Sequence, residues 1–168
     1  MKSVIAIVLV GLALAAAPTE APHPGMETLK SLEGRWTGPA IWDRGGEPGS
    51  AEFDISYEVT AGGSSVMETM MPGTPGEMVT MYHLDGEDLV LVHYCTSGNQ
   101  PRMVLESSSD ASELSFRCLG GTNMTEADSH MHSARLRIVD SDRLQGEWSS
   151  VKGGVVQWVA RAELVRRK

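Results

Sequence analysis

Residues 130–150 of the chain, HMHSARLRIVDSDRLQGEWSS, contain two alternations of apolar and polar side chains with a polar turn between them. Leu136 and Ile138 share one face of the first segment, and Trp148 belongs to the apolar face of the second. The turn at 140–142 carries the aspartates and serine that tight turns use. Because side chains alternate between the two faces of a strand, this stretch predicts an antiparallel hairpin with one buried face.

The same alternation recurs along the chain from Trp36 onward, at the roughly 8–12 residue spacing that is typical of an all-β sandwich or barrel. The predicted strands are 35–43, 51–60, 64–71, 77–84, 88–95, 101–108, 112–119, 130–140, 143–150 and 154–165. Only 26–33 has helical spacing. Without crossover helices the strands must pair in sequence, and about ten such strands protect their edges best by closing into a barrel. We therefore predict an all-β fold, an antiparallel up-and-down β-barrel with a short N-terminal helix and room for a cavity.

The N-terminus has the pattern of a secretory signal peptide, in which Lys2 precedes an apolar run over 4–14 and small residues at 15–17. Pro18 ends the run before it reaches the roughly 20 residues of a membrane span, although an uncleaved anchor is an alternative. The expected organisation is a signal peptide over 1–16, a disordered spacer over 17–25 and a barrel domain over 26–168. We expect a secreted or periplasmic protein with no membrane span after cleavage.

Charge and motifs exclude several classes of function. The 168 residues include 14 lysines and arginines against 22 aspartates and glutamates, for a net charge of -8. No basic stripe interrupts this acidic surface, so a nucleic-acid partner is excluded. The sequence has no zinc-protease, phosphate-loop, dinucleotide or nucleophile-elbow motif. We therefore assign no catalytic residue and favour a role that is not enzymatic.

Several side chains able to orient a ligand are candidates for the inward faces. They are His93, His130, His132, Glu68, Tyr82, Cys95 and Trp148. In the 77–95 hairpin both faces are largely apolar, so alternation does not choose between them, and Glu68 faces inward only if the turn at 61–63 does not shift the register by one residue. The i, i+2 spacing of His130 and His132 puts both imidazoles on one face of a regular strand, which a metal site can use. In the alternative interpretation these groups hydrogen-bond to the backbone or to each other, as buried polar groups do. The sequence identifies neither a metal nor a cofactor.

Methionines gather in one part of the chain, at Met67, Met70, Met71, Met78 and Met81. Flexible thioethers suit a pocket that adapts to varied apolar ligands. Ordinary filling of the core and its rim is the other interpretation.

The two cysteines allow two interpretations. An exported chain favours a disulfide, but Cys95 and Cys118 are expected two strands apart, about 9–10 Å from the spacing of strands in a sheet. That separation exceeds the reach of a disulfide. Either a bulge in 95–101 closes the gap, or both residues are buried free thiols.

Gly34-Arg35-Trp36, which follows the predicted helix and opens the first strand, resembles the Gly-x-Trp start of lipocalins and related calycins. The resemblance implies that Trp36 closes the bottom of the barrel and that an arginine from a late strand packs over it. By position, Arg161 is the candidate for that arginine.

Three further segments, 78–86, 93–103 and 130–132, look like an uncharacterised bacterial lipocalin-like family, a domain of unknown function, over about residues 30–165. This resemblance implies a calycin-type barrel and no established activity. The predicted function is binding of a small apolar molecule in the barrel lumen. The alternatives are a metal- or histidine-dependent enzyme that uses the lumen His/Glu cluster, and a protein-interaction barrel whose contact is the doubly apolar 77–95 hairpin.

Overall fold

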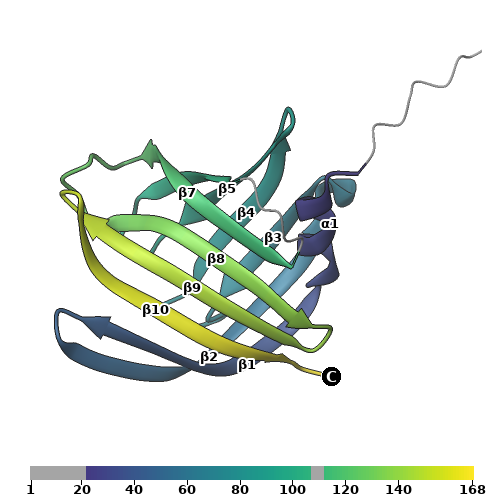
Figure 1. Ribbon diagram of the computed structural model, residues 1–168, viewed down its shortest axis with the longest axis horizontal. Helices are drawn as coiled ribbons and strands as arrows, with labels where there is room; N and C mark the ends of the chain where they lie inside the picture. Colours follow the sequence, from purple (N-terminus) through teal and green to yellow (C-terminus); the bar gives the residue numbers. More distant parts are fainter. Residues whose placement is uncertain (1–21, 107–111) are drawn as a thin grey trace, which may run out of the picture.

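The structure is a computed structural model that describes residues 22–106 and 112–168, and it forms a barrel of antiparallel strands with one helix at its end (Figure 1). The elements are α1 (Pro24–Ser31), β1 (Gly34–Arg44), β2 (Glu47–Thr60), the short 3-10 helix η1 (Ala61–Gly63), β3 (Ser65–Met70), β4 (Met78–Asp85), β5 (Asp88–Tyr94), β6 (Gln100–Leu105), β7 (Glu113–Thr122), β8 (His130–Asp140), β9 (Arg143–Lys152) and β10 (Val155–Arg166). Every predicted strand is confirmed within the described residues, with ends that differ by a few residues, and the last two positions of the predicted strand 101–108 lie outside the described residues.

The strands pair in the order of an up-and-down meander that closes on itself. Each strand is antiparallel to its neighbours in the chain, and β1 pairs with β10 from Trp36↔Arg166 to Arg44↔Trp158. Because every strand has a partner on both sides, the sheet has no free edge to protect. The predicted fold class, a closed antiparallel β-barrel of ten strands, is confirmed.

The two ends of the barrel are built differently. In Figure 1, α1 and the C-terminus lie at one end, and the tips of the β1–β2 and β9–β10 hairpins lie at the other. The β1–β2 turn is Gly45-Gly46, with φ of +65° and +90°. A two-residue turn with positive φ at both positions matches the twist of the strands that it joins. We call the helix end the closed end and the hairpin end the open end.

Helix α1 closes its end of the barrel with an apolar face. Met26, Leu29 and Leu32 are each at most 3% exposed. Nδ1 of His23 accepts a hydrogen bond of 3.3 Å from the Met26 N–H, which caps the start of the helix. The helix begins at Pro24, two residues before the predicted start. The last two residues of the expected spacer are thus helical, because proline is favoured in the first turn.

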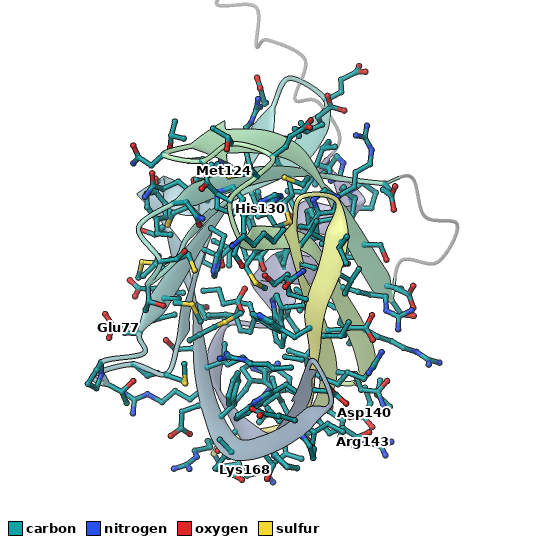
Figure 2. All side chains as sticks on the ribbon, turned by 90° about the vertical axis from the view of Figure 1, so that its left-hand side faces the viewer. Glu77, Met124, His130, Asp140, Arg143 and Lys168 are labelled. Atoms are coloured by element: carbon teal, nitrogen blue, oxygen red, sulfur yellow. The ribbon has the colours of Figure 1, made fainter. Side chains whose placement is uncertain are left out.

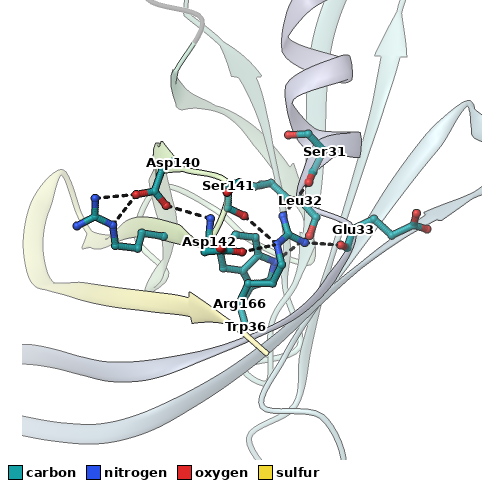
Figure 3. Close-up of polar contacts among 9 residues, drawn as sticks. Ser31, Leu32, Glu33, Trp36, Asp140, Ser141, Asp142 and Arg166 are labelled. Carbon is teal, nitrogen blue, oxygen red and sulfur yellow. Dashed lines mark hydrogen bonds and ion pairs between the residues drawn. The ribbon is translucent and has the colours of Figure 1, made fainter. Parts of the chain in front are cut away.

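An arginine does pack over Trp36, but it is Arg166 and not Arg161. The Arg166 guanidinium lies 4.2 Å from the centre of the Trp36 ring. It also donates to the carbonyl oxygens of Glu33 at 2.6 Å and Ser31 at 2.9 Å, which lie just beyond and at the end of α1 (Figure 3). Arg161 lies outside and donates to Glu147 at 2.6 Å. The correction follows from register, because Trp36 pairs with Arg166 while Arg161 pairs with Ile41.

The β4–β5 hairpin, whose two faces are both apolar, has its inward face decided by the closed sheet. Thr80, Tyr82, Leu91 and His93 are buried inside the barrel. On the other face Tyr94 is 48% exposed. Alternation alone could not choose between these faces because both carry large apolar side chains.

The predicted signal peptide, 1–16, and positions 17–21 of the predicted spacer lie outside the described residues. Within 22–106 and 112–168, the structure has no helix long and apolar enough to cross a membrane.

Candidate functional site

The open end of the barrel leads into an apolar pocket of about 340 Å³ inside the lumen. Its wall is mainly aromatic rings, thioethers and small side chains: Trp42, Phe53, Trp148 and Trp158; Met70, Met71, Met78 and Met131; Ala51, Ala160 and Gly76. These residues come from β1–β4, from β8–β10 and from the β3–β4 connection. The pocket is within the size range of small-molecule sites, about 300–1,000 Å³.

The mouth of this pocket carries its few polar groups, Arg44, Cys95 and Thr96. Arg44 is the last residue of β1, and its guanidinium lies 5.2 Å from the centre of the Trp158 ring. A cation held over an indole face is fixed in position while its charge stays at the rim. The mouth can therefore contact the polar or anionic end of a molecule whose apolar body fills the pocket.

Below the pocket, a void of about 10 Å³ continues toward the middle of the lumen, and Met131 and Trp148 line both spaces. His93 borders this void. Its Nδ1 is 2.9 Å from the Thr80 hydroxyl, whereas its Nε2 has no hydrogen-bond partner. Burial lowers the pKa of His93 to about 4, so the ring is neutral at physiological pH. The void is about the size that holds one water molecule.

A buried carboxyl group contacts Tyr82, which lines this void. Glu68 is fully buried, and its Oε2 accepts a 2.5 Å hydrogen bond from the Tyr82 hydroxyl. Burial raises the pKa of Glu68 to about 7, and the hydrogen bond from Tyr82 offsets part of that rise. Burial and the charge of Glu68 also raise the pKa of Tyr82 and Tyr57 well above the ordinary value. Neither Oε1 of Glu68 nor the Tyr57 hydroxyl has a partner with hydrogen-bond geometry.

The structure does not gather the predicted constellation into one site. Glu68, Tyr82 and His93 are inside the barrel, whereas His130 and His132 line a different pocket. The prediction that His130 and His132 face the lumen is wrong because β8 has a register shift between Met131 and Ser133. A bulge of this kind inserts one residue into the strand and reverses which side chains face inward beyond it.

In β8 the reversal puts Met131 into the lumen, where it lines the pocket beside Trp148. His132 is exposed, and its ring centre is 5.4 Å from that of His130.

Some of the remaining predicted residues line the pocket and others do not. Trp148 and Cys95 line the pocket, as does part of the methionine cluster, whereas Met67 pairs with Met81 across β3 and β4 and neither lines it. Cys95 and Cys118 are free thiols. Of the two interpretations of the cysteines, the structure therefore shows the one without a bridge.

Sequence reasoning missed several residues that line the pocket. Trp42, Arg44 and Phe53 were not among the candidates, although Trp158 lies on a predicted inward face. The signal in the sequence was the tryptophans themselves, because three of the four in the chain line this one pocket. Their grouping into one site becomes visible only when the register of β1 against β2 and β10 is known.

Comparison with known proteins supports the fold and goes no further. No family model matches the chain, and no curated protein matches it. One similar solved structure is a protein of unknown function from the DUF3598 family of Nostoc punctiforme PCC 73102, with a TM-score of 0.61 and 13% identity over 83% of this chain. This chain spans about half of that one, 49%.

A second similar structure is Rv2717c from M. tuberculosis, also with a TM-score of 0.61, at 17% identity over 86% of this chain and 98% of the other. Identities this low establish a shared fold only. The comparisons therefore show that this β-barrel shares its architecture with two solved structures, one of which is a protein of unknown function.

Proposed function

We propose that the protein is an exported, lipocalin-like barrel that binds a small, largely apolar molecule in the lumen pocket behind its open end. The observation that carries the proposal is the pocket of about 340 Å³ with a wall of indole rings and thioethers. Covering apolar ligand surface contributes about 25 cal/mol per Å². Methionine side chains can adjust to different ligand shapes, so we expect a class of related molecules.

Polar groups around the pocket favour a ligand with one polar end. Arg44 lies at the mouth, where a carboxylate or sulfonate can reach it without entering the barrel. The unpartnered Nε2 of His93 borders the void below and can hold a water. Glu68 and Tyr82 are already bonded to each other. The ligand is therefore oriented by Arg44 at the rim.

Two fluorescent naphthalene probes test this proposal. The uncharged N-phenyl-1-naphthylamine tests the apolar pocket, and the anionic 1-anilinonaphthalene-8-sulfonate tests Arg44 as well. Ala160→Phe places a ring in the pocket and is expected to lower the affinity for both probes by at least about tenfold, because the added ring occupies the volume that a probe needs. Arg44→Gln is expected to weaken the anionic probe about fivefold to tenfold, from loss of a charge-assisted contact, and to leave the uncharged probe unchanged.

Val139→Phe is the matched control, because it adds the same ring to a β8 position that is 43% exposed. It is expected to bind both probes like the unmodified protein. Equal binding by the Ala160→Phe and Val139→Phe variants would show that the probes occupy a surface other than the lumen.

Export is the second part of the proposal and rests on Lys2 and the apolar run over 4–14. The intact mass of protein recovered from the periplasm or culture medium is expected to lack the residues up to Ala15 or Ala16. A full-length mass confined to the cytoplasm would contradict export and leave the binding proposal standing.

The other two predicted functions have less support. An enzyme using one lumen cluster of histidines and glutamate loses its geometric basis, because the β8 bulge separates His130 and His132 from His93. The protein-interaction alternative stays a prediction.

A further inference from the structure

The strands β7 and β8 separate near the open end of the barrel, and three potential metal ligands meet at the point of separation. Their ladder ends at Arg117↔Ser133, although β7 continues to Thr122 and β8 begins at His130. Cys118 is the first residue of β7 beyond the ladder. The β8 bulge directs His130 and His132 toward it, so that one ligand atom from each of the three lies within 4.8 Å of the others.

Hydrogen bonds fix which nitrogen of His130 is free. Its Nδ1 is 2.9 Å from the Asp128 carbonyl oxygen, which can only accept, so Nδ1 carries the proton. In the neutral ring Nε2 then presents a bare lone pair. This pairing of a ring N–H with a backbone carbonyl is the arrangement that orients most histidine ligands of metals. Nε2 of His130 is directed at Nδ1 of His132, 3.2 Å away.

His132 can become a ligand by moving one proton. In the absence of metal its Nδ1 donates to Nε2 of His130, since a lone pair on each nitrogen would repel. His132 is exposed, so water can exchange the proton to its Nε2 and leave Nδ1 free. The two nitrogens are then already close to the spacing of about 3.3 Å that tetrahedral zinc with Zn–N bonds of about 2.05 Å requires.

The surroundings of Cys118 suit a thiolate ligand. Its Sγ lies 3.6 Å from the Gly120 carbonyl oxygen, to which a thiol donates, and it accepts a hydrogen bond of 3.3 Å from the backbone N–H of Gly120. Such a bond stabilises negative charge on sulfur and belongs to the outer shell of many metal–thiolate sites. Since one ligand atom from each of the three residues lies within 4.8 Å of the others, the sulfur and the nitrogens need to approach by at most about 1.2 Å to reach the N···S distance of about 3.6 Å in a zinc site.

We propose that Cys118, His130 and His132 bind one Zn²⁺ ion, at a site separate from the lumen pocket. One thiolate with two imidazoles is a ligand set that binds zinc in preference to magnesium or calcium. The three side chains line a pocket of about 730 Å³, which Met124 also lines and which shares no residue with the lumen pocket. Met124 and His130 appear together near the top of Figure 2. The open pocket leaves the fourth zinc position to water, as in zinc sites with three protein ligands.

Cobalt(II) in place of zinc provides the spectroscopic test. The untagged full chain, kept reduced with a phosphine, is titrated with Co²⁺. The expected result is one equivalent bound, with the visible bands of tetrahedral cobalt and a near-ultraviolet thiolate-to-cobalt band. Zn²⁺ is then expected to displace the cobalt stoichiometrically. Lowering the pH is expected to weaken binding because protons compete for the same atoms.

Variants assign the ligands. Cys118→Ser is expected to abolish the thiolate-to-cobalt band. His132→Ala is expected to lower the affinity for zinc by more than the roughly 100-fold that loss of an outer-shell partner costs. The matched controls are Cys95→Ser, which removes the other free thiol, and His83→Ala, on β4. Both are expected to bind cobalt and zinc as tightly as the unmodified protein does. Because His132 is exposed, its variant is expected to fold, which circular dichroism and the naphthalene probes verify.

Two results would overturn the proposal. One is the absence of stoichiometric cobalt or zinc binding by folded, reduced protein. The other is one-equivalent binding that survives in both Cys118→Ser and His132→Ala, which would place the metal elsewhere on the chain. Either result would leave the lumen proposal intact, because no residue of this site lines the lumen pocket.

Discussion

Glu68 and His93 are buried titratable groups on neighbouring parts of the lumen wall, and their effects on stability oppose each other. Burial raises the pKa of Glu68 from 4.5 to about 7. Between these values the folded chain keeps a proton that the unfolded chain has lost, so stability falls as pH rises. Burial lowers the pKa of His93 from 6.5 to about 4. Here the unfolded chain holds the extra proton, so stability rises with pH.

Each shift is worth about 3 kcal/mol, at about 1.4 kcal/mol per pH unit. The two effects therefore nearly cancel between pH 4.5 and 6.5, and single substitutions are expected to expose them. In the Glu68→Gln variant only the effect of His93 remains. When the pH is lowered from 6.5 to 4.5, the unfolding free energy of this variant is therefore expected to fall by about 3 kcal/mol relative to that of the unmodified protein. In His93→Gln it is expected to rise by about as much. Urea denaturation at a series of pH values measures both.

The matched control is Glu58→Gln, on the exposed face of β2, which is expected to follow the unmodified protein. If the Glu68→Gln and unmodified curves ran parallel from pH 4.5 to 7, the raised pKa of Glu68 would be wrong.

At the scale of elements, the closed end depends on the contact between the C-terminal end of β10 and helix α1. Arg166 stacks on Trp36, and the indole N–H of Trp36 donates to the Leu32 carbonyl at 2.8 Å. Arg166 also donates to the carbonyl oxygens of Ser31 and Glu33. The last carbonyls of a helix have no partner within it. The Arg166 side chain thus satisfies the Ser31 carbonyl at the end of the helix and the Glu33 carbonyl just beyond it, and it covers the floor of the barrel.

Arg166→Ala is expected to lower the unfolding free energy by about 2–3 kcal/mol, because it removes a cation–π contact and the side-chain donors to the Ser31 and Glu33 carbonyl oxygens. Arg166→Lys is expected to recover little, since an ammonium cannot stack and fork its hydrogen bonds in the same way. Arg161→Ala serves as the comparison. Its side chain is 60% exposed and pairs with Glu147, so a loss below about 1 kcal/mol is expected. Chemical denaturation of the three variants would contradict this assignment if Arg161→Ala proved the more damaging.

At the scale of the whole molecule, the barrel depends on the closure between its first and last strands. Gly38 of β1 is buried there, and a Cβ added to it would lie 2.0 Å from the backbone oxygen of Glu163 in β10. The obstacle is backbone, so a larger residue must push the two strands apart.

Gly38→Ala is expected to destabilise the protein by about 3 kcal/mol through overpacking. Because the strain falls on the β1–β10 pairing, hydrogen exchange is expected to speed up first at the amides of these two strands. Ser50→Ala, at an exposed position opposite Ile41 in β2, is the control and is expected to change stability by less than about 0.5 kcal/mol. Uniform acceleration of exchange over all strands would show that closure is not the weak point.

The sequence alone determined the number and order of the strands, because alternation and turn residues are local properties that do not depend on distant partners. It also placed Trp148 on an inward face by the same period of two, whereas the inward face of Tyr82 was decided by the closed sheet. Closure into a barrel followed from the need of ten consecutive strands to protect their edges.

Only the tertiary structure decided the site. One extra residue in β8 reversed the faces of His130 and His132, and no local pattern marks where a bulge will form, because it depends on pairing with β9. The register between β1 and β10 likewise selected Arg166 rather than Arg161, and it brought Trp42 next to Trp158 across residues far apart in the chain. Register is set by the packing of the closed sheet as a whole, which a linear pattern does not contain.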